Sequence, residues 1–289
     1  MGYPDELTRL LEEYLRQIAY GEDGAVTPLT MAMNYSLLAG GKRIRPVLLM
    51  AAGQAYGMAP ERLLPTAAAM EMIHTYSLIH DDLPAFDNDD LRRGKPTCHV
   101  EFGESVATLA GDALFAEAFR LICERQEAEP ATKLAVIEEV AVATGVQGMV
   151  GGQFLDVAGL PDDGQESLRL LHSLKTGRLI IACVHCGGLL AGAPEPELTN
   201  LRGFAGELGL LFQIKDDILD VIGETAVLGK QAGADARLQR STYVSVFGLE
   251  EAGRLALSSR DAALAALGEI GGETDTLAGI TNYIYERQL

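Results

Sequence analysis

The apolar residues of this chain recur at helical spacing along almost its whole length. Residues 5–19 are the clearest case, because Leu7, Leu11, Leu15 and Ile18 follow one another at steps of three and four and so share one face. No stretch alternates apolar and polar residues like a half-buried strand over more than a few positions. We therefore expect an all-α protein.

Glycine and proline divide this pattern into separate helices. Gly40 and Gly41 suit a helix end, Pro46 fits the first turn of the next helix, and Pro84 should end a long apolar helix by Leu83. No internal repeat or low-complexity linker interrupts the series, so we expect one helical-bundle domain over residues 1–289. The expected helices are 5–19, 27–38, 46–56, 60–82, 105–128, 131–158, 166–176, 178–191, 196–222, 241–247, 250–268 and 275–287.

Charge and composition exclude several classes of protein. A net charge of −18 argues against nucleic-acid binding, which needs a basic surface. The longest apolar run, 179–193, is interrupted by His185 and is shorter than the ~18–20 residues that span a bilayer. No secretory signal is visible, and Cys183 and Cys186 lack the second pair of a zinc or redox site, so core packing is their expected role. We expect a cytoplasmic protein without a membrane span.

Two aspartate clusters, at 81–87 and 216–220, each close an apolar helix. On a helix Asp216, Asp217 and Asp220 share a face with Gln213, and three like charges there repel unless a cation bridges them. A solvated acidic face is the common alternative, but the residues around this cluster are apolar. Carboxylates without a nearby histidine–cysteine set favour Mg²⁺ over zinc.

Cations gather near both clusters. The glycine turn at 40–46 contains Lys42 and Arg45 at a helix start, a place suited to a diphosphate, and Arg92, Arg93 and Lys95 follow the first cluster. Ion pairs across a dimer are the alternative. Two anion-binding groups and two metal-binding clusters predict two phosphorylated substrates, and an apolar cavity would suit a hydrocarbon on each.

Together these residues resemble the trans-isoprenyl diphosphate synthase family, most closely its bacterial-type farnesyl diphosphate synthases. The resemblance covers residues 40 to about 245 in the order of that family. The matching motifs are DDxxxxD at 81–87, LRRGKPT at 91–97, DDxxD at 216–220, GGKRIRP at 40–46, KTG at 175–177, GGQ at 151–153 with Asp156, FQ at 212–213, GK at 229–230 and STY at 241–243.

The resemblance implies a helical fold around a deep central cavity, a homodimer and three Mg²⁺ ions, with Mn²⁺ as a possible substitute. It implies that isopentenyl diphosphate condenses with dimethylallyl and then geranyl diphosphate to give farnesyl diphosphate. By residue, it assigns metal binding to Asp81, Asp82, Asp87, Asp216, Asp217 and Asp220. It assigns the allylic diphosphate to Arg92, Lys175 and Lys230, isopentenyl diphosphate to Lys42, Arg45, His74 and Arg93, and carbocation stabilisation to Thr176 and Gln213.

At two positions the resemblance assigns a role less directly. Tyr76 resembles the aromatic floor that sets product length in this family. Helix geometry brings Ser77 nearer to the face of Asp81, so both residues are candidates for setting product length. Arg240 stands where the family usually has lysine, so it is expected to support the allylic diphosphate with altered geometry.

Three alternatives stay open at this point. A geranylgeranyl or geranyl diphosphate synthase would differ by few cavity residues. A class I terpene cyclase shares the metal chemistry, but it does not need a pocket for a second diphosphate. A regulatory subunit of a heteromeric prenyl synthase would be expected to lack some of the six motif aspartates, all of which are present.

Overall fold

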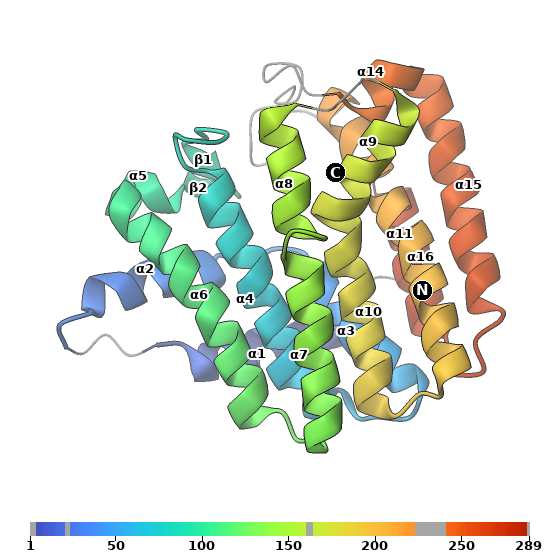
Figure 1. Ribbon diagram of the computed structural model, residues 1–289, viewed down its shortest axis with the longest axis horizontal. Helices are drawn as coiled ribbons and strands as arrows, with labels where there is room; N and C mark the ends of the chain where they lie inside the picture. The colour runs from blue at the N-terminus through green and yellow to red at the C-terminus, as the bar shows by residue number, and fades with distance from the viewer. Residues whose placement is uncertain (1–3, 21–23, 160–163, 223–240, 288–289) are drawn as a thin grey trace. The chain divides into compact units, whose positions relative to one another are not determined.

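The computed structural model describes residues 4–20, 24–159, 164–222 and 241–287, and confirms the all-α expectation (Figure 1). The only strands in these ranges form a two-stranded antiparallel hairpin, β1 (Leu91–Arg92) and β2 (Lys95–Pro96). The helices and helical turns are α1 (Asp5–Ile18), α2 (Thr27–Leu37), α3 (Ile44–Ala55), η1 (Pro60–Leu63), α4 (Leu64–Asp81), α5 (Cys98–Phe102), α6 (Glu104–Arg125), α7 (Pro130–Thr144), α8 (Met149–Ala158), α9 (Gln165–His172), η2 (Ser173–Gly177), α10 (Arg178–Ala191), α11 (Glu195–Ile222), α14 (Tyr243–Phe247), α15 (Leu249–Leu267) and α16 (Asp275–Glu286).

The chain divides into two compact units. The expectation of a single domain over residues 1–289 stays a prediction. Unit 2 consists of Asp5–Val47 and Glu61–Glu127. Within it α4 and α6 lie side by side, and α1 and α2 also pack against α4 (Figure 1). The apolar stripe of α1 is confirmed as the buried face, because Leu7, Leu11 and Leu15 are at most 4% exposed.

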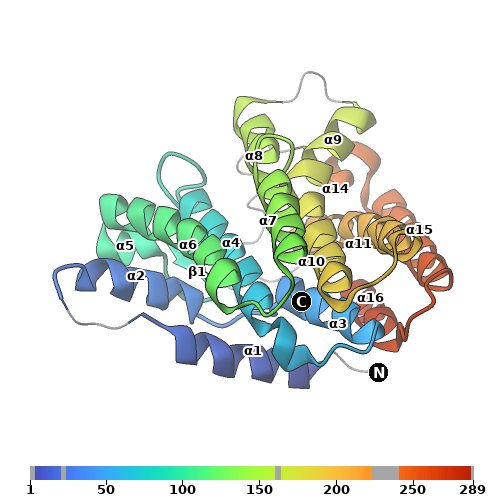
Figure 2. The ribbon, with the colours of Figure 1, turned by 60° about the horizontal axis from the view of Figure 1, so that its bottom comes forward.

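Unit 1 consists of Met1–Pro4, Leu48–Pro60 and Ala128–Leu289. In its described part α11 packs between α10 and α15, a row that Figure 2 shows from below. Glycine permits close packing at particular points: a Cβ atom at Gly187 on α10 would lie 2.2 Å from the carbonyl oxygen of Leu49. Close packing of α10 on α3 therefore explains that glycine.

Two details of the predicted helices are wrong. The expected helix 131–158 is interrupted between Thr144 and Met149, where the chain turns so tightly that a Cβ atom at Gly148 would lie 2.0 Å from the Ala143 carbonyl oxygen. The loop expected at 83–104 contains the hairpin and α5. Both errors arise from short local turns, which periodicity over a helix-length window does not resolve.

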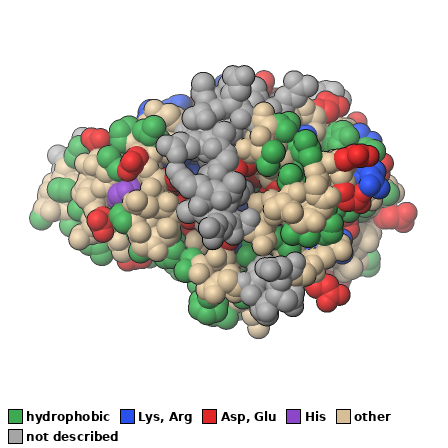
Figure 3. Space-filling model, turned by 90° about the horizontal axis from the view of Figure 1, so that it is seen from above, with side chains coloured by type: hydrophobic (Ala, Val, Ile, Leu, Met, Phe, Trp, Pro, Cys, Tyr) green, Lys and Arg blue, Asp and Glu red, His purple; other side chains and the backbone are tan. Residues whose placement is uncertain are grey.

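The acidic surface agrees with the negative net charge, and the long apolar segments can be compared with the expected absence of a membrane span. Figure 3 shows acidic side chains scattered over one face, with few basic ones among them. Two stretches, Pro130–Ala158 and Gln165–Ala191, are apolar and long enough to cross a membrane by length and composition. The second is 67% buried inside the protein over its most apolar window, as expected of a core helix. It contains Cys183 and Cys186, both buried.

Candidate active site

The first aspartate motif lies at the end of α4 in unit 2. This helix is buried along most of its length, and its last residue is Asp81. The chain then turns back, because the Asp87 amide donates to the Asp81 carbonyl oxygen at 2.9 Å and the Asn88 amide donates to that of Leu83 at 3.2 Å. The helix end expected by Leu83 is confirmed, and the Asp81 and Asp87 side chains remain partly exposed.

Asp82 contacts a cation of the same motif. Its carboxylate accepts hydrogen bonds from Arg92 Nε at 2.8 Å and from Arg92 Nη2 at 2.5 Å, and the residue is 2% exposed. Burial raises the pKa of Asp82, although the hydrogen bonds and the charge of Arg92 oppose that shift. Asp82 therefore fixes the position of Arg92, and its role as a metal ligand stays a prediction.

Several cations of unit 2 meet around His74. Arg45 Nη1 lies 3.3 Å from His74 Nε2. Burial lowers the pKa of His74 well below its ordinary value, and the charges of Arg45 and Arg93 lower it further. Arg93 donates to the Gly40 carbonyl oxygen and covers Gly41, where a Cβ atom would lie 2.6 Å from the guanidinium. The structure thus brings together three of the four residues predicted to hold a second diphosphate.

Lys42, the fourth residue predicted to hold the second diphosphate, is exposed on the glycine turn. Its neighbour Arg43 is buried and has a role that the sequence did not reveal. Arg43 is 3% exposed and donates through Nε to Glu12 at 2.8 Å and through Nη1 to Glu71 at 2.5 Å. Its Nη2 donates to the Leu37 carbonyl oxygen at 2.8 Å. Arg43 holds the turn in place, and no local signal distinguishes it from its neighbours because its carboxylate partners are 28 and 31 residues distant.

The second aspartate motif lies near the end of α11 in unit 1 and is held by a chain of hydrogen bonds. The Thr176 hydroxyl donates to Gln213 Oε1 at 3.0 Å, and Gln213 Nε2 donates to Asp217 Oδ1 at 2.7 Å. The Tyr243 amide donates to Asp217 Oδ2 at 2.7 Å, and Asp217 is 2% exposed. Three predicted site residues therefore form one connected group.

The other two aspartates of this motif differ in surroundings. Asp220 is 5% exposed, whereas Asp216 forms an ion pair in which Arg287 Nη2 lies 2.5 Å from Asp216 Oδ1. The Arg287 guanidinium also covers the Phe212 ring at 4.5 Å from its centroid. Sequence reasoning missed Arg287 because it is 71 residues from its partner in the chain.

Lys175 lies in η2, a single π-helical turn between α9 and α10. Its Nζ lies 2.6 Å from Asp156 Oδ2 on α8, which orients the cation. The two segments approach closely because Gly152 lacks a side chain: a Cβ atom there would lie 2.2 Å from the Lys175 backbone nitrogen. The glycine motif at 151–153 therefore serves to seat Lys175.

Gly152→Ala is expected to destabilise the protein by about 1–3 kcal/mol, because the new methyl group must displace backbone. The midpoint of urea unfolding measures this loss. Gly203→Ala on α11 is the matched control, since no atom lies within 4 Å of its Cβ position. That control should gain stability, by up to about 1 kcal/mol, from helix propensity. Equal midpoints for the two variants would contradict the close approach.

His172 precedes this turn and stacks on Tyr243, with ring centroids 5.4 Å apart and an angle of 28° between the rings. Burial is the main reason that the pKa of His172 is lowered to about 4. The folded chain therefore keeps His172 neutral at a pH where the unfolded chain, with a histidine pKa near 6.5, takes up a proton.

His172→Phe should flatten the acid side of the stability profile. Below about pH 6.5 the unfolded wild type binds a proton that the folded one refuses, so its stability falls with pH until about pH 4. Phenylalanine keeps the stacking and cannot titrate. Between pH 7 and pH 5 the wild type should lose about 2 kcal/mol more than the variant in urea unfolding. Parallel profiles would show that His172 titrates normally.

Tyr76 is buried in an aromatic cluster of unit 2. Its ring packs edge to face on Phe115 at 5.0 Å and on His80 at 5.6 Å, and Phe115 packs on Phe119 at 5.2 Å. Burial, and then the charge of Asp81, raise the pKa of Tyr76 to about 12. Neighbouring Ser77 instead donates its hydroxyl to the His74 carbonyl oxygen at 2.9 Å.

The carboxylates of the two aspartate motifs suit Mg²⁺, but they do not form a complete set of protein ligands around an ion. Among the described residues no three histidine, cysteine or acidic side chains converge as a complete metal site. Mg²⁺ is commonly held by one or two carboxylates together with water and substrate phosphates. Each aspartate motif offers such carboxylates in its own unit, so metal sharing between the motifs stays a prediction. Lys230 and Arg240 lie outside the described residues.

Comparison with known proteins identifies the family. The polyprenyl synthetase family model matches residues 26–266. The chain is 46% identical to a farnesyl diphosphate synthase of Escherichia coli, covering 90% of each chain. It is 49% identical to a geranylgeranyl diphosphate synthase of Cyanophora paradoxa, covering 76% of this chain and 74% of that one.

Solved structures agree with this result. The crystal structure of a Helicobacter pylori geranyltransferase, complexed with magnesium and isoprenyl diphosphate, matches with a TM-score of 0.86 and 30% identity. The match covers 98% of this chain and 97% of that one. Since the family model spans most of the sequence, and a relative 46% identical covers 90% of it, this chain belongs to the polyprenyl synthetase family.

Proposed function

We propose that this chain is a Mg²⁺-dependent short-chain trans-prenyltransferase that condenses isopentenyl diphosphate with dimethylallyl and then geranyl diphosphate to give farnesyl diphosphate. The observation that carries the proposal is the presence, in each unit, of an aspartate motif together with positioned cations: Arg92 with the first, and Lys175 on the unit that contains the second. Relatives named for farnesyl diphosphate synthesis at 46% identity support the product assignment.

The allylic diphosphate would be held by Arg92, Lys175 and Lys230, with Arg240 in support. Arg92 and Lys175 are already oriented by Asp82 and Asp156. Such fixed cations favour the departure of an anion because they require no rearrangement as the charge develops. Bound Mg²⁺, which we propose at Asp81, Asp82, Asp87, Asp216, Asp217 and Asp220 as three ions, would supply further positive charge to the departing diphosphate.

Isopentenyl diphosphate would bind at Lys42, Arg45, His74 and Arg93. A His74 that stays neutral among arginines can offer one ring N–H to a phosphate oxygen without adding a buried charge. These cations hold the second substrate near the first, which replaces a collision in solution by a step within one complex.

The bonds change as follows. The allylic C–O bond breaks, and its electron pair leaves with the diphosphate. The isopentenyl double bond attacks the allylic carbon, which forms the new C–C bond and moves the positive charge to the isopentenyl unit. Loss of a proton to the released diphosphate restores a double bond. The oxygens of Thr176 and Gln213 would stabilise the allylic cation, and no protein base is required.

One assay tests the proposal. The protein is incubated with Mg²⁺, isopentenyl diphosphate and each allylic diphosphate in turn, and the products are separated by chain length. Farnesyl diphosphate is expected from dimethylallyl and geranyl diphosphate, with no product when EDTA replaces Mg²⁺. A dominant geranylgeranyl product would overturn the farnesyl assignment alone. Turnover of allylic diphosphate without isopentenyl diphosphate would favour a cyclase, and no turnover at all would favour a regulatory subunit.

Tyr76→Ala is expected to shift the product toward geranylgeranyl diphosphate. The Tyr76 ring is held rigidly by Phe115 and His80, so its removal opens space that the neighbours do not readily fill. Product chain length after exhaustive incubation measures the effect. Ser77→Ala tests the second candidate for product length, whose hydroxyl donates to the His74 carbonyl oxygen within α4. Leu109→Ala on α6 is the control, because its side chain is 56% exposed and its products should match those of the wild type. Unchanged products from Tyr76→Ala would remove Tyr76 as the floor.

A homodimer and a cytoplasmic location complete the proposal. The molar mass of the purified protein by light scattering, compared with the 30.8 kDa chain, tests the dimer. Replacement of Mg²⁺ by Mn²⁺ in the same assay tests whether the carboxylates accept either ion.

A further inference from the structure

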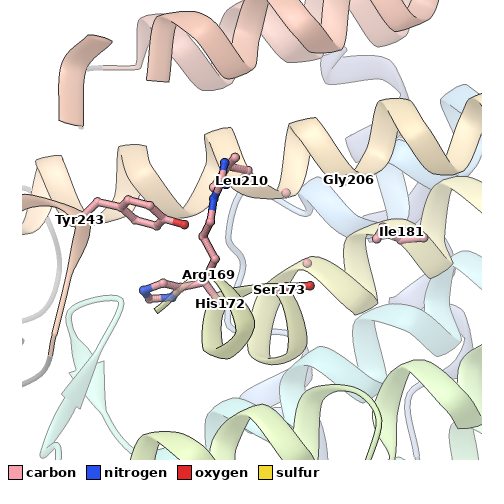
Figure 4. Close-up of a pocket in the computed structure, with 9 residues that line it drawn as sticks. Arg169, His172, Ser173, Ile181, Gly206, Leu210 and Tyr243 are labelled. Carbon is pink, nitrogen blue, oxygen red and sulfur yellow. The ribbon is translucent and has the colours of Figure 1, made fainter. Parts of the chain in front are cut away.

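Unit 1 contains a cavity that the proposed reaction does not use. It lies between the α9–η2–α10 segment and α11, with Tyr243 of α14 at one end, and has a volume of about 200 Å³ (Figure 4). Arg169, Ser173, Gly177 and Ile181 follow one another at steps of four, so they present one face to it.

Two buried polar atoms in the cavity wall have no hydrogen-bond partner at standard geometry among the described residues: His172 Nε2 and the Tyr243 hydroxyl oxygen. Tyr243 as a whole is 1% exposed. Burial raises the pKa of Tyr243, and this effect is larger than that of the Arg169 guanidinium beside the hydroxyl, whose charge and loose side-chain hydrogen bond both lower the pKa. Buried polar atoms of this kind carry a free-energy cost that a ligand with matching groups would remove.

The rest of the wall is apolar or lacks side chains. Ile181 and Leu210 contribute hydrocarbon, and glycines leave the middle open. A Cβ atom at Gly206 would meet nothing within 4 Å. For scale, an engineered apolar cavity of about 150 Å³ in another protein holds benzene. A cavity of about 200 Å³ therefore has room for a six-membered ring with a small polar head.

Arg169 determines the charge of that head. Its side chain is exposed and extends from α9 toward α11 at the edge of the cavity (Figure 4). A guanidinium, a phenol hydroxyl and an imidazole N–H are all donors that a carboxylate accepts.

We propose that this cavity is a binding site for a small carboxylate with an apolar ring or chain, of about the size of benzoate. The carboxylate pairs with Arg169 and accepts a hydrogen bond from Tyr243 or His172, and the apolar part lies between Ile181 and Leu210. The site is separate from the residues assigned to either diphosphate, so it does not depend on the proposed function.

Titration calorimetry of the full-length protein with sodium benzoate tests this site. Saturable binding is expected, with none for benzyl alcohol, which has the ring without the charge. Arg169→Gln should weaken binding about tenfold or more, as for a hydrogen bond to a charged group. Arg178→Gln, at another exposed arginine of the same segment, should bind like the wild type.

A second pair of variants tests the position of the ligand. Gly206→Leu fills the cavity and should abolish binding, whereas Gly203→Leu, three residues earlier and exposed on α11, should leave it unchanged. If Gly206→Leu does not fold by circular dichroism, Tyr243→Phe takes its place, with a loss of about threefold or more.

Competition separates this site from the diphosphate pockets. Benzoate binding should persist in saturating Mg²⁺ and inorganic diphosphate. Displacement by diphosphate, equal affinity in the Gly203 and Gly206 variants, or the absence of saturable binding would each overturn the proposal. None of these outcomes depends on whether the protein transfers prenyl groups.

Discussion

Asp217→Asn is expected to lower turnover by about 10³-fold or more while leaving the fold intact. The carboxylate accepts hydrogen bonds at both oxygens, from the Gln213 side chain and from the Tyr243 amide. Asparagine keeps the size but offers one acceptor, so its amide group must face an N–H donor. The change also removes a negative charge proposed to bind metal at the departing diphosphate, and such electrostatic stabilisation accounts for a large part of catalysis.

The substitution should change stability little. Loss of one charge relieves repulsion among Asp216, Asp217 and Asp220, which offsets the weakened hydrogen bonds. Turnover with saturating substrates and the urea midpoint are measured together. Glu250→Gln, an exposed acidic residue on α15 in the same unit, controls for the change in net charge and should retain full activity. Retained activity in Asp217→Asn would exclude a metal role for this residue.

Arg43→Met is expected to have the largest effect on stability, a loss of about 3–5 kcal/mol. The guanidinium is almost fully buried between Glu12 and Glu71, and its removal leaves Glu71, 1% exposed, without its cation. A buried carboxylate without its partner must either remain charged in a poor solvent or take up a proton, and both cost free energy. The urea midpoint of the full-length protein measures the loss.

A double variant shows whether the ion pair is the cause. Arg43→Met combined with Glu71→Gln removes both charges and should recover part of the loss. Arg9→Met breaks an exposed pair with Glu13 one turn along α1, and should change stability by less than about 0.5 kcal/mol. A similar small effect at Arg43 would mean that its pairing contributes little to the stability of the turn.

The site could be predicted where its contacts are local. Gln213 and Asp217 are four residues apart on one helix, and the expectation that they share a face is confirmed by a hydrogen bond at 2.7 Å. The end of the long apolar helix by Leu83, inferred from Pro84, is confirmed because α4 ends at Asp81. In both cases covalent geometry and helix periodicity limit where the residues can lie.

Contacts between distant segments could not be predicted in this way. Nothing in the run from Lys42 to Arg45 indicates that Arg43 is the buried one, since Glu12 and Glu71 decide it. The same holds for Asp216, whose partner Arg287 belongs to the end of the chain. The break of the expected helix 131–158 also depends on packing, because glycines at 145 and 148 are compatible with either a helix or a turn.

The sequence by itself determined the helical class, most helix boundaries, the two aspartate motifs and, through its resemblance, the family. These follow from the spacing of residues along the chain, which the backbone converts directly into helix faces and ends. Only the tertiary structure decided which charged residues hold the fold and which remain accessible to ligands, and it alone revealed the cavity beside Tyr243. Those outcomes depend on which distant side chains meet when apolar surface is buried, and burial then determines the free-energy cost of each charge.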